Sequence, residues 1–589
     1  MRHRSIAAVT ASVAALAVAW SAVAPAALAQ GAPAAAQPPR SEALAAISRD
    51  AVQAILAYEP TAEYSTGLKA PSQDYFADRS QAGLARIEAI EDGLYTRLKK
   101  IDPTRLNTAD SIDYAILQEQ LEGSIGARVC RFELWNVSHF GWQTGMADIA
   151  AQQAVGTPEA RAQALKRWGS MPTYVDNEIA NLRRGLAAGY SAPRTVVQRV
   201  IKQFDTLLAA PVEKSPFLSP ATRDEDAAFK AAMQAVVADK VNPSMKRYRD
   251  FLVNEYLPAA RSTLGVSAHP NGEACYRASL RSYTTLDRSG REVFELGQRT
   301  VAANMERVEE IGRKAFGTSD LKAIVARIAN DPANRFKDEA ELLAYSREIA
   351  SRAEKVMPQA FATVPSQPLV VEPFPDFMKG SGVSSHYVVS PDPAKPGIYR
   401  INLDDVAGER RSQAAITAVH EGWPGHHMQL ASSAALPKSD ISKLSFNGAY
   451  IEGWARYSEM LSEELGIYDN DYTLAARRLW PARGMVIDPG IHLYGWTAEQ
   501  VEAYAMESGR FTPQDAKDLA DRVAMWPGQL TSYDSGGLYI LALREQAQKE
   551  LGPKFDLKGF HQVVLGSGVV PLAKLRQNVE TWIAARRQG

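Results

Sequence analysis

Residues 415–430 read AITAVHEGWPGHHMQL, an apolar lead-in that runs into a His-Glu pair and then into two adjacent histidines. Three of the nine histidines of the chain, His420, His426 and His427, fall within this stretch. Neutral imidazoles are common zinc ligands, and a carboxylate beside them can take a proton from water. The stretch therefore predicts a metal site with its own general base, Glu421.

The spacing of the histidines departs from the common HExxH motif, in which two histidines four residues apart leave one face of a helix. Here Pro424 stands four residues after His420. The next histidines, His426 and His427, follow six and seven residues after His420. Proline removes a backbone donor and clashes with the preceding turn, so Pro424-Gly425 should bulge or break the helix. We expect this break to bring His426 to the second ligand position. His427 is the alternative, about 10 Å further along a straight helix.

A third ligand is expected from residues 449–461, AYIEGWARYSEML, which have the pattern of a helix. Glu452 lies near the start of this helix. A carboxylate from a following helix completes a site of two histidines and one glutamate, with the fourth position open for water. We predict one Zn²⁺ per chain, bound by His420, His426 and Glu452.

Four motifs together resemble a bacterial family called domain of unknown function 885, which is grouped with the glutamate-zincin metallopeptidases. They are HEGWPGHHMQ, YIEGWARYSE, RGMVIDPGIHLYGWT and PGQLTSYDSGG, within residues 420–537, and weaker similarity extends over most of the remaining chain. The resemblance implies a mainly α fold, a large multi-helix zincin-like peptidase architecture with a small β-sheet beside the zinc-binding helix.

The resemblance also implies which groups stabilise the oxyanion that forms when water adds to the scissile carbonyl. In glutamate-zincins a downstream histidine or tyrosine donates a hydrogen bond to it, and His492 and Tyr533 match these positions. Asp488 would orient His492 if the backbone between them is helical. The alternative for Tyr533 is a buried ring whose hydroxyl is satisfied locally. Arg483 and Arg544 could bind a substrate carboxylate or form ordinary ion pairs.

Three short segments interrupt the helical pattern of the chain, at residues 367–371, 386–390 and 397–403. They are rich in β-branched or aromatic residues and are separated by proline and glycine, so they predict a small sheet. In metallopeptidases of the resembled type, the edge strand of such a sheet binds an extended peptide. Residues 399–403 are the candidate edge, with a purely structural strand as the alternative.

The composition is that of a soluble globular protein: 589 residues, 46% hydrophobic and 23% charged. The 66 basic residues nearly balance the 67 acidic ones, which argues against nucleic acid as a partner. Helical periodicity begins at Ser41, a candidate N-cap, and recurs in a long helix through Val293 and Ile311. We expect a helical N-terminal half at about residues 41–265 and a zinc-site half at about 266–589.

The N-terminus has the order of a secretory signal peptide: Arg2 and Arg4, an apolar run over residues 6–23, and Ala-Leu-Ala at 27–29. We predict cleavage after Ala29, a disordered Ala/Pro leader at residues 30–40, and a periplasmic or secreted protein without stable membrane insertion. An uncleaved membrane anchor is the alternative.

Cys130 and Cys275 are the only two cysteines of the chain. Export to an oxidising compartment would allow them to form a disulfide. Two buried, unpaired thiols are an equally good interpretation, because a chain of this size can fold without a disulfide.

These observations predict an exported zinc-dependent peptidase that hydrolyses a peptide or amide substrate with metal-activated water and Glu421 as general base. One alternative is a metal-dependent amidase acting on a non-peptide amide. The other is a non-catalytic helical binding protein with a structural metal site, although the presence of Glu421 favours an enzyme. The substrate, endo- versus exo-cleavage and the oligomeric state are left open.

Overall fold

The computed structural model describes residues 38–375, 384–390, 392 and 394–588. Over these residues the protein is mainly α-helical with one small sheet, as predicted. The predicted signal peptide and leader residues 30–37 lie outside the described residues. Within the described part, no helix has the length and apolar character needed to cross a bilayer.

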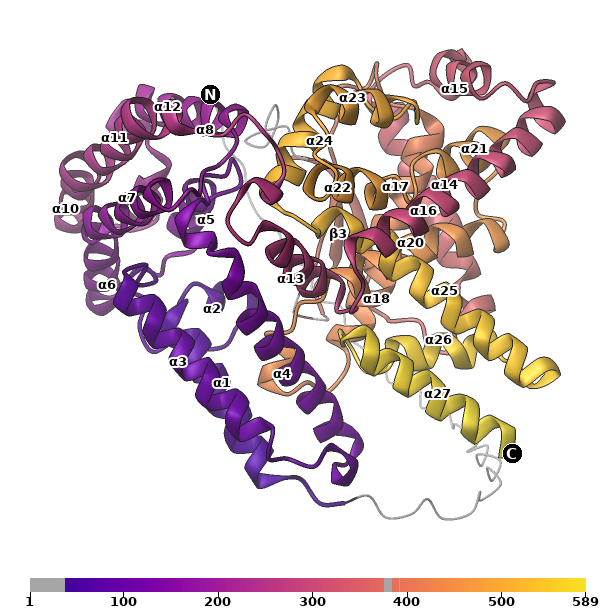
Figure 1. Ribbon diagram of the computed structural model, residues 1–589, viewed down its shortest axis with the longest axis horizontal. Helices are drawn as coiled ribbons and strands as arrows, with labels where there is room; N and C mark the ends of the chain where they lie inside the picture. Colours follow the sequence, from indigo (N-terminus) through magenta and orange to yellow (C-terminus); the bar gives the residue numbers. More distant parts are fainter. Residues whose placement is uncertain (1–37, 376–383, 391, 393, 589) are drawn as a thin grey trace, which may run out of the picture.

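The first half of the chain forms helices that lie on one side of the molecule, coloured indigo to magenta in Figure 1. They are α1 Glu42–Tyr58, α2 Ala62–Thr66, α3 Gln81–Leu98, α4 Thr108–Ala127, α5 Trp142–Gln152, α6 Pro158–Gly169, α7 Met171–Ala187, α8 Arg194–Ala209, α9 Ser219–Thr222, α10 Ala227–Val236, α11 Asn242–Phe251 and α12 Leu257–Ala259. Helix α1 begins after Ser41, whose side chain accepts a hydrogen bond from the Leu44 N–H at 3.3 Å. The predicted N-cap is therefore confirmed.

The second half lies mainly on the other side, with α13 Gly272–Thr284 between the two (Figure 1). Its other helices are α14 Gly290–Ile311, α15 Leu321–Asn330, α16 Glu339–Ala360, α17 Arg411–Glu421, α18 His426–Ala434, α19 Asp440–Lys443, α20 Gly448–Glu464, α21 Asp471–Leu479, α22 Gly484–His492, α23 Ala498–Met506, α24 Pro513–Met525, α25 Ser532–Leu551, α26 Leu557–Leu565 and α27 Leu572–Gln588. The long helix predicted through Val293 and Ile311 is α14, which begins with a reciprocal capping box between Ser289 and Glu292.

The three predicted strands are present as β1 Leu369–Pro373, β2 His386–Val388 and β3 Gly397–Ile401. Their order is β1-β3-β2, with β1 parallel and β2 antiparallel to β3. The prediction that residues 399–403 form the edge is wrong, because β3 is the central strand and its hydrogen-bonding groups on both sides face a neighbour. The edges are β1 and β2.

Two large hydrophobic clusters form most of the core. One extends from Phe76 through the helices of the first half to Val266, Met485 and Met525, and so crosses the predicted boundary near residue 265. The other packs α16, α17, α20 and α25 to α27 around β1 and β3. The second cluster supports the helices that carry the candidate metal ligands.

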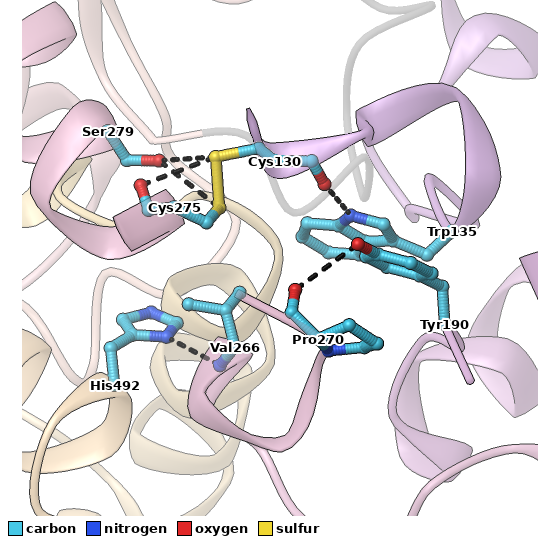
Figure 2. The surroundings of a disulfide bond; sticks show 8 residues. All are labelled: Cys130, Trp135, Tyr190, Val266, Pro270, Cys275, Ser279 and His492. Atoms are coloured by element: carbon cyan, nitrogen blue, oxygen red, sulfur yellow. Dashed lines mark hydrogen bonds between the residues drawn. A yellow bond between two sulfur atoms is a disulfide. The ribbon is translucent and has the colours of Figure 1, made fainter. Parts of the chain in front are cut away.

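A disulfide joins Cys130, just after α4, to Cys275 in α13, and the two Cα atoms are 4.5 Å apart. Figure 2 shows the bond beside Ser279, with the Trp135 indole N–H donating to the Cys130 carbonyl at 3.0 Å. Of the two alternatives for the cysteines, the structure contains the disulfide. The bond ties the N-terminal helices to the helix between the two halves.

Candidate metal centre

Helix α17 carries His420 and Glu421 in its last turn, held in place by the burial of Ala415, Ala418 and Val419. The helix ends at Glu421, and α18 begins at His426. The predicted break at Pro424-Gly425 is therefore present. A Cβ atom on Gly425 would lie 2.0 Å from the His420 carbonyl oxygen, so only glycine allows the chain to turn this tightly.

Helix α20 carries Glu452 and also holds the broken turn. The Trp454 indole N–H and the Ser458 hydroxyl both donate to the Pro424 carbonyl, at 2.9 and 3.1 Å. On its other side α20 packs closely on α25, where a Cβ atom on Gly536 would lie 1.8 Å from the Ala449 carbonyl oxygen. The position of Glu452 relative to the histidines is thus set by contacts on two sides of one helix.

The structure brings His420, His426 and Glu452 together. The Nε2 atoms of His420 and His426 each lie 3.4 Å from Oε2 of Glu452, and one ligand atom from each residue lies within 4.8 Å of the others. Bonds of about 2.0–2.1 Å around a tetrahedral zinc ion separate its ligands by about 3.3 Å. The donor set and its spacing therefore fit a zinc ion.

The charges around the three side chains also favour a cation. Although burial disfavours its protonated form, hydrogen bonds to Glu452 and Glu459 raise the pKa of His420 to about 10. Burial opposes ionisation of Glu452, but His420 and His426 hold the pKa of Glu452 well below its usual range. Solvent reaches the group, because 23% of the Glu452 side chain is exposed.

His427, the alternative ligand, is turned away from the group. Its Nδ1 lies 3.0 Å from the Tyr387 hydroxyl, and its Nε2 lies 3.0 Å from the Gln367 carbonyl. The residue is fully buried, and burial lowers the pKa of His427 to about 4. Both ring nitrogens are therefore used in hydrogen bonds that hold α18 to β2 and the segment before β1.

A charged network behind His420 was not foreseen from the sequence. Glu459 Oε1 lies 2.9 Å from His420 Nδ1, and Arg456 bridges Glu459 at 2.8 Å and Asp534 at 3.0 Å. A carboxylate on the outer nitrogen fixes the tautomer that leaves Nε2 available to a metal. The sequence does contain one indication of this contact: Glu452 and Glu459 are seven residues apart, a spacing that puts both side chains on one face of α20.

Glu421 is next to a candidate ligand and is itself oriented by the sheet. Its Oε2 accepts a hydrogen bond from the backbone N–H of Tyr387 at 2.9 Å. Tyr387 belongs to β2, so the edge strand beside the site is β2. The sequence around Tyr387 gave no sign that its backbone N–H donates a hydrogen bond to Glu421.

Tyr533 lies near Glu452, whose charge acts on the phenol. The hydroxyl accepts a hydrogen bond from Arg522 Nη2 at 3.3 Å, which leaves its own hydrogen free to donate. Burial raises the pKa of Tyr533, and so the group is a neutral donor at ordinary pH. Tyr533 is thus within electrostatic reach of Glu452, and its role as an oxyanion donor stays a prediction.

His492 does not fit the expected role of oxyanion donor. Its Nδ1 accepts from the Val266 backbone N–H at 3.2 Å (Figure 2), and its Nε2 lies 2.9 Å from the Val523 carbonyl. The ring is fully buried, so it offers no donor to a substrate. Asp488 does not orient it either, because that carboxylate instead accepts from the Tyr276 hydroxyl at 2.7 Å and from a backbone N–H.

The two arginines considered for substrate binding have structural partners. Arg483 is buried and binds the Leu479 carbonyl at 2.9 Å and Glu507 at 3.0 Å. Arg544 pairs with Glu464 at 2.7 Å. The alternative of ordinary ion pairing therefore holds for both.

The protein belongs to the family described as "bacterial protein of unknown function (DUF885)", which matches residues 60–579. No curated protein matches the chain. A solved structure of a candidate lipoprotein from Colwellia psychrerythraea is similar over 92% of this chain and 99% of its own, with a TM-score of 0.82 and 25% identity. A candidate lipoprotein of unknown function from Shewanella oneidensis has a TM-score of 0.77 and 21% identity, covering 91% of this chain and 99% of its own, and shows the fold alone.

Proposed function

We propose that this protein is an exported zinc-dependent peptidase with a zincin-like site. The observation that carries the proposal is the convergence of His420 Nε2, His426 Nε2 and Glu452 Oε2. Beside them lies Glu421, which accepts a hydrogen bond from the backbone N–H of Tyr387. A structural zinc site is usually closed by four protein ligands, whereas a catalytic one keeps a position open. Three converging groups and a neighbouring base match the catalytic type.

A zinc ion held by His420, His426 and Glu452 would polarise the scissile carbonyl and lower the pKa of a water molecule. Glu421 accepts the proton of the attacking water and delivers it to the leaving amine. Tyr533 donates its hydroxyl hydrogen to the oxygen on which charge develops. Glu459 holds His420 in the required tautomer.

Export of the protein is supported by the charged, apolar and small-residue order of residues 1–29 and by the similarity to the structure from Colwellia psychrerythraea that is described as a candidate lipoprotein. Both observations are typical of proteins that leave the cytoplasm. We assign the protein to the periplasm or the exterior of the cell.

The test is mass spectrometry of a defined peptide library after incubation with purified, zinc-loaded protein, with and without a chelator. Cleavage that stops on chelation and returns with zinc is expected. A parallel library of non-peptide amides separates a peptidase from an amidase. If no amide in either library is cleaved, the protein is a binding protein with a metal site of another role.

A further inference from the structure

Strand β2 orients the candidate base Glu421, yet the sheet itself holds this strand by little. The strand has three residues, His386–Val388, and pairs with β3 alone. The N–H of Tyr387, in the middle of the strand, donates to Glu421 Oε2 at 2.9 Å. Among the residues that the structure describes, no second donor binds this carboxylate. The direction of the Glu421 side chain therefore depends on what fixes Tyr387.

The Tyr387 side chain is fixed by His427, in α18. Its hydroxyl lies 3.0 Å from His427 Nδ1, and Nε2 of the same imidazole lies 3.0 Å from the Gln367 carbonyl oxygen. A carbonyl oxygen can only accept, so in this neutral imidazole Nε2 carries the hydrogen and Nδ1 is left as an acceptor. The Tyr387 hydroxyl is then the donor. Burial raises the pKa of Tyr387, which keeps that hydrogen on the phenol.

The surroundings of this hydrogen bond are tightly packed. A Cβ atom on Gly397, in β3, would collide with the Tyr387 hydroxyl and lie 2.8 Å from His427 Nδ1, so glycine is what leaves room for the bond. The Trp423 ring packs edge-on against the His427 imidazole, with the ring centres 4.4 Å apart. Trp423 belongs to the broken turn between α17 and α18. The hydrogen bond thus joins the turn between the two candidate histidine ligands to the strand that orients the candidate base.

We propose that Tyr387 and His427 are positioning residues, which hold the Glu421 carboxylate at a fixed place relative to the metal. His427 acts on Tyr387 through its Nδ1, and Tyr387 acts on Glu421 through its backbone N–H. Such a link suits a general base, because a misplacement of about 1 Å can cost on the order of 10²-fold in rate. This inference rests on the proposed peptidase function, and it gives His427 a role in catalysis that is not metal binding.

The experiment measures kcat, KM and zinc content for the wild type, Tyr387→Phe, His427→Leu and His427→Gln, with one peptide that the wild type cleaves. Tyr387→Phe removes the hydroxyl and keeps the ring and the backbone N–H. A glutamine side chain can offer an acceptor to Tyr387 and a donor to Gln367, whereas leucine offers neither. The matched control is Tyr190→Phe, because the hydroxyl of this buried tyrosine also donates one hydrogen bond, to the Pro270 carbonyl at 3.2 Å (Figure 2).

Tyr387→Phe and His427→Leu should lower kcat by about 10- to 100-fold, with KM and zinc content close to those of the wild type, because only the base is misplaced. His427→Gln should recover part of the loss, and Tyr190→Phe should keep the wild-type kcat. In a Glu421→Gln background the effect of Tyr387→Phe on kcat should disappear, because residues that act as one unit are not additive.

A wild-type kcat for Tyr387→Phe, or an equal fall in kcat with and without Glu421→Gln, would overturn the positioning role and leave the peptidase proposal standing. If the wild type cleaves no peptide, the peptidase proposal fails, and hydrogen exchange of the backbone amide at position 387 still decides whether the link exists. Faster exchange in Tyr387→Phe and His427→Leu than in the wild type and Tyr190→Phe would uphold the link, and equal exchange in all four would overturn it.

Discussion

The imidazole of His420 lies between two carboxylates, with Nδ1 2.9 Å from Glu459 Oε1 and Nε2 3.4 Å from Glu452 Oε2. Both glutamates come from α20, two turns apart. One helix thus supplies a candidate ligand and the group that orients another ligand. Because Arg456 also contacts Glu459, the orientation of His420 depends on a network that extends into α25 through Asp534.

Glu459→Gln should weaken zinc binding without preventing folding. Glutamine keeps an acceptor for the histidine but removes the charge that raises its basicity, so we expect about a 10- to 100-fold loss of zinc affinity. Competition with a coloured chelator measures the affinity. Glu502→Gln, on α23, is the control and should bind zinc like the wild type. Equal affinity for Glu459→Gln and the control would contradict the role given to Glu459.

His426→Ala should lose most of the bound zinc, while His427→Ala should keep it. The Nε2 of His426 faces Glu452, whereas both nitrogens of His427 are bonded to Tyr387 and Gln367. His427→Ala should instead lower the melting temperature, since it leaves two buried polar groups without a partner. Plasma mass spectrometry of the two purified variants gives the metal content, and zinc lost from His427→Ala alone would reverse the assignment.

Glu421→Gln should keep zinc and stability but lose activity. Glutamine can still accept the hydrogen bond from the Tyr387 N–H, but it cannot take up a proton, so turnover should fall on the order of 10²-fold or more. Glu452→Gln is the informative comparison and should lower zinc content and turnover together. Cleavage by Glu421→Gln at the wild-type rate, with zinc bound, would show that another group is the base.

Asp488 should make the protein less stable as the pH rises toward neutrality. Burial raises the pKa of Asp488 to about 7, although the Tyr276 hydroxyl and the Gly528 N–H favour the anion. An unfolded aspartate has a pKa of about 3.9, so between these values the folded state binds the extra proton and stability falls with increasing pH. The contribution is complete below about pH 4 and is lost as the pH rises through about 7, on the order of 4 kcal/mol in total.

Asp488→Asn removes this ionisation and should flatten that part of the stability profile. Urea unfolding at pH 5 and pH 8 measures it: the free energy of unfolding of the variant, relative to the wild type, should be higher at pH 8 than at pH 5. Asp521→Asn is not a suitable control, because burial also raises the pKa of Asp521. The exposed Asp148→Asn serves instead and should leave the wild-type profile unchanged. A parallel profile for wild type and Asp488→Asn would contradict the expected pH dependence.

Local sequence patterns predicted much of the secondary structure of this protein. The mainly helical class, the Ser41 cap, the three strands and the helix break at Pro424-Gly425 all follow from capping, periodicity and proline sterics, which act within a few residues. The three helices α17, α18 and α20, which carry His420, His426 and Glu452, were recognisable for the same reason. Their convergence was expected from motif spacing, and the close packing of α20 on α25 at Gly453 and Gly536 realises it.

The tertiary structure alone decided the contacts between distant residues. His492 has a suggestive position in the sequence, yet Val266 and Val523 occupy its two nitrogens. Residues 399–403 have the pattern of a strand, but only pairing with both neighbours makes β3 central. Whether an arginine forms a structural ion pair, like Arg483 with Glu507, depends on which carboxylates the fold brings near. Sequence determines which groups can do the chemistry, because their intrinsic properties are local, whereas packing determines which of them remain available.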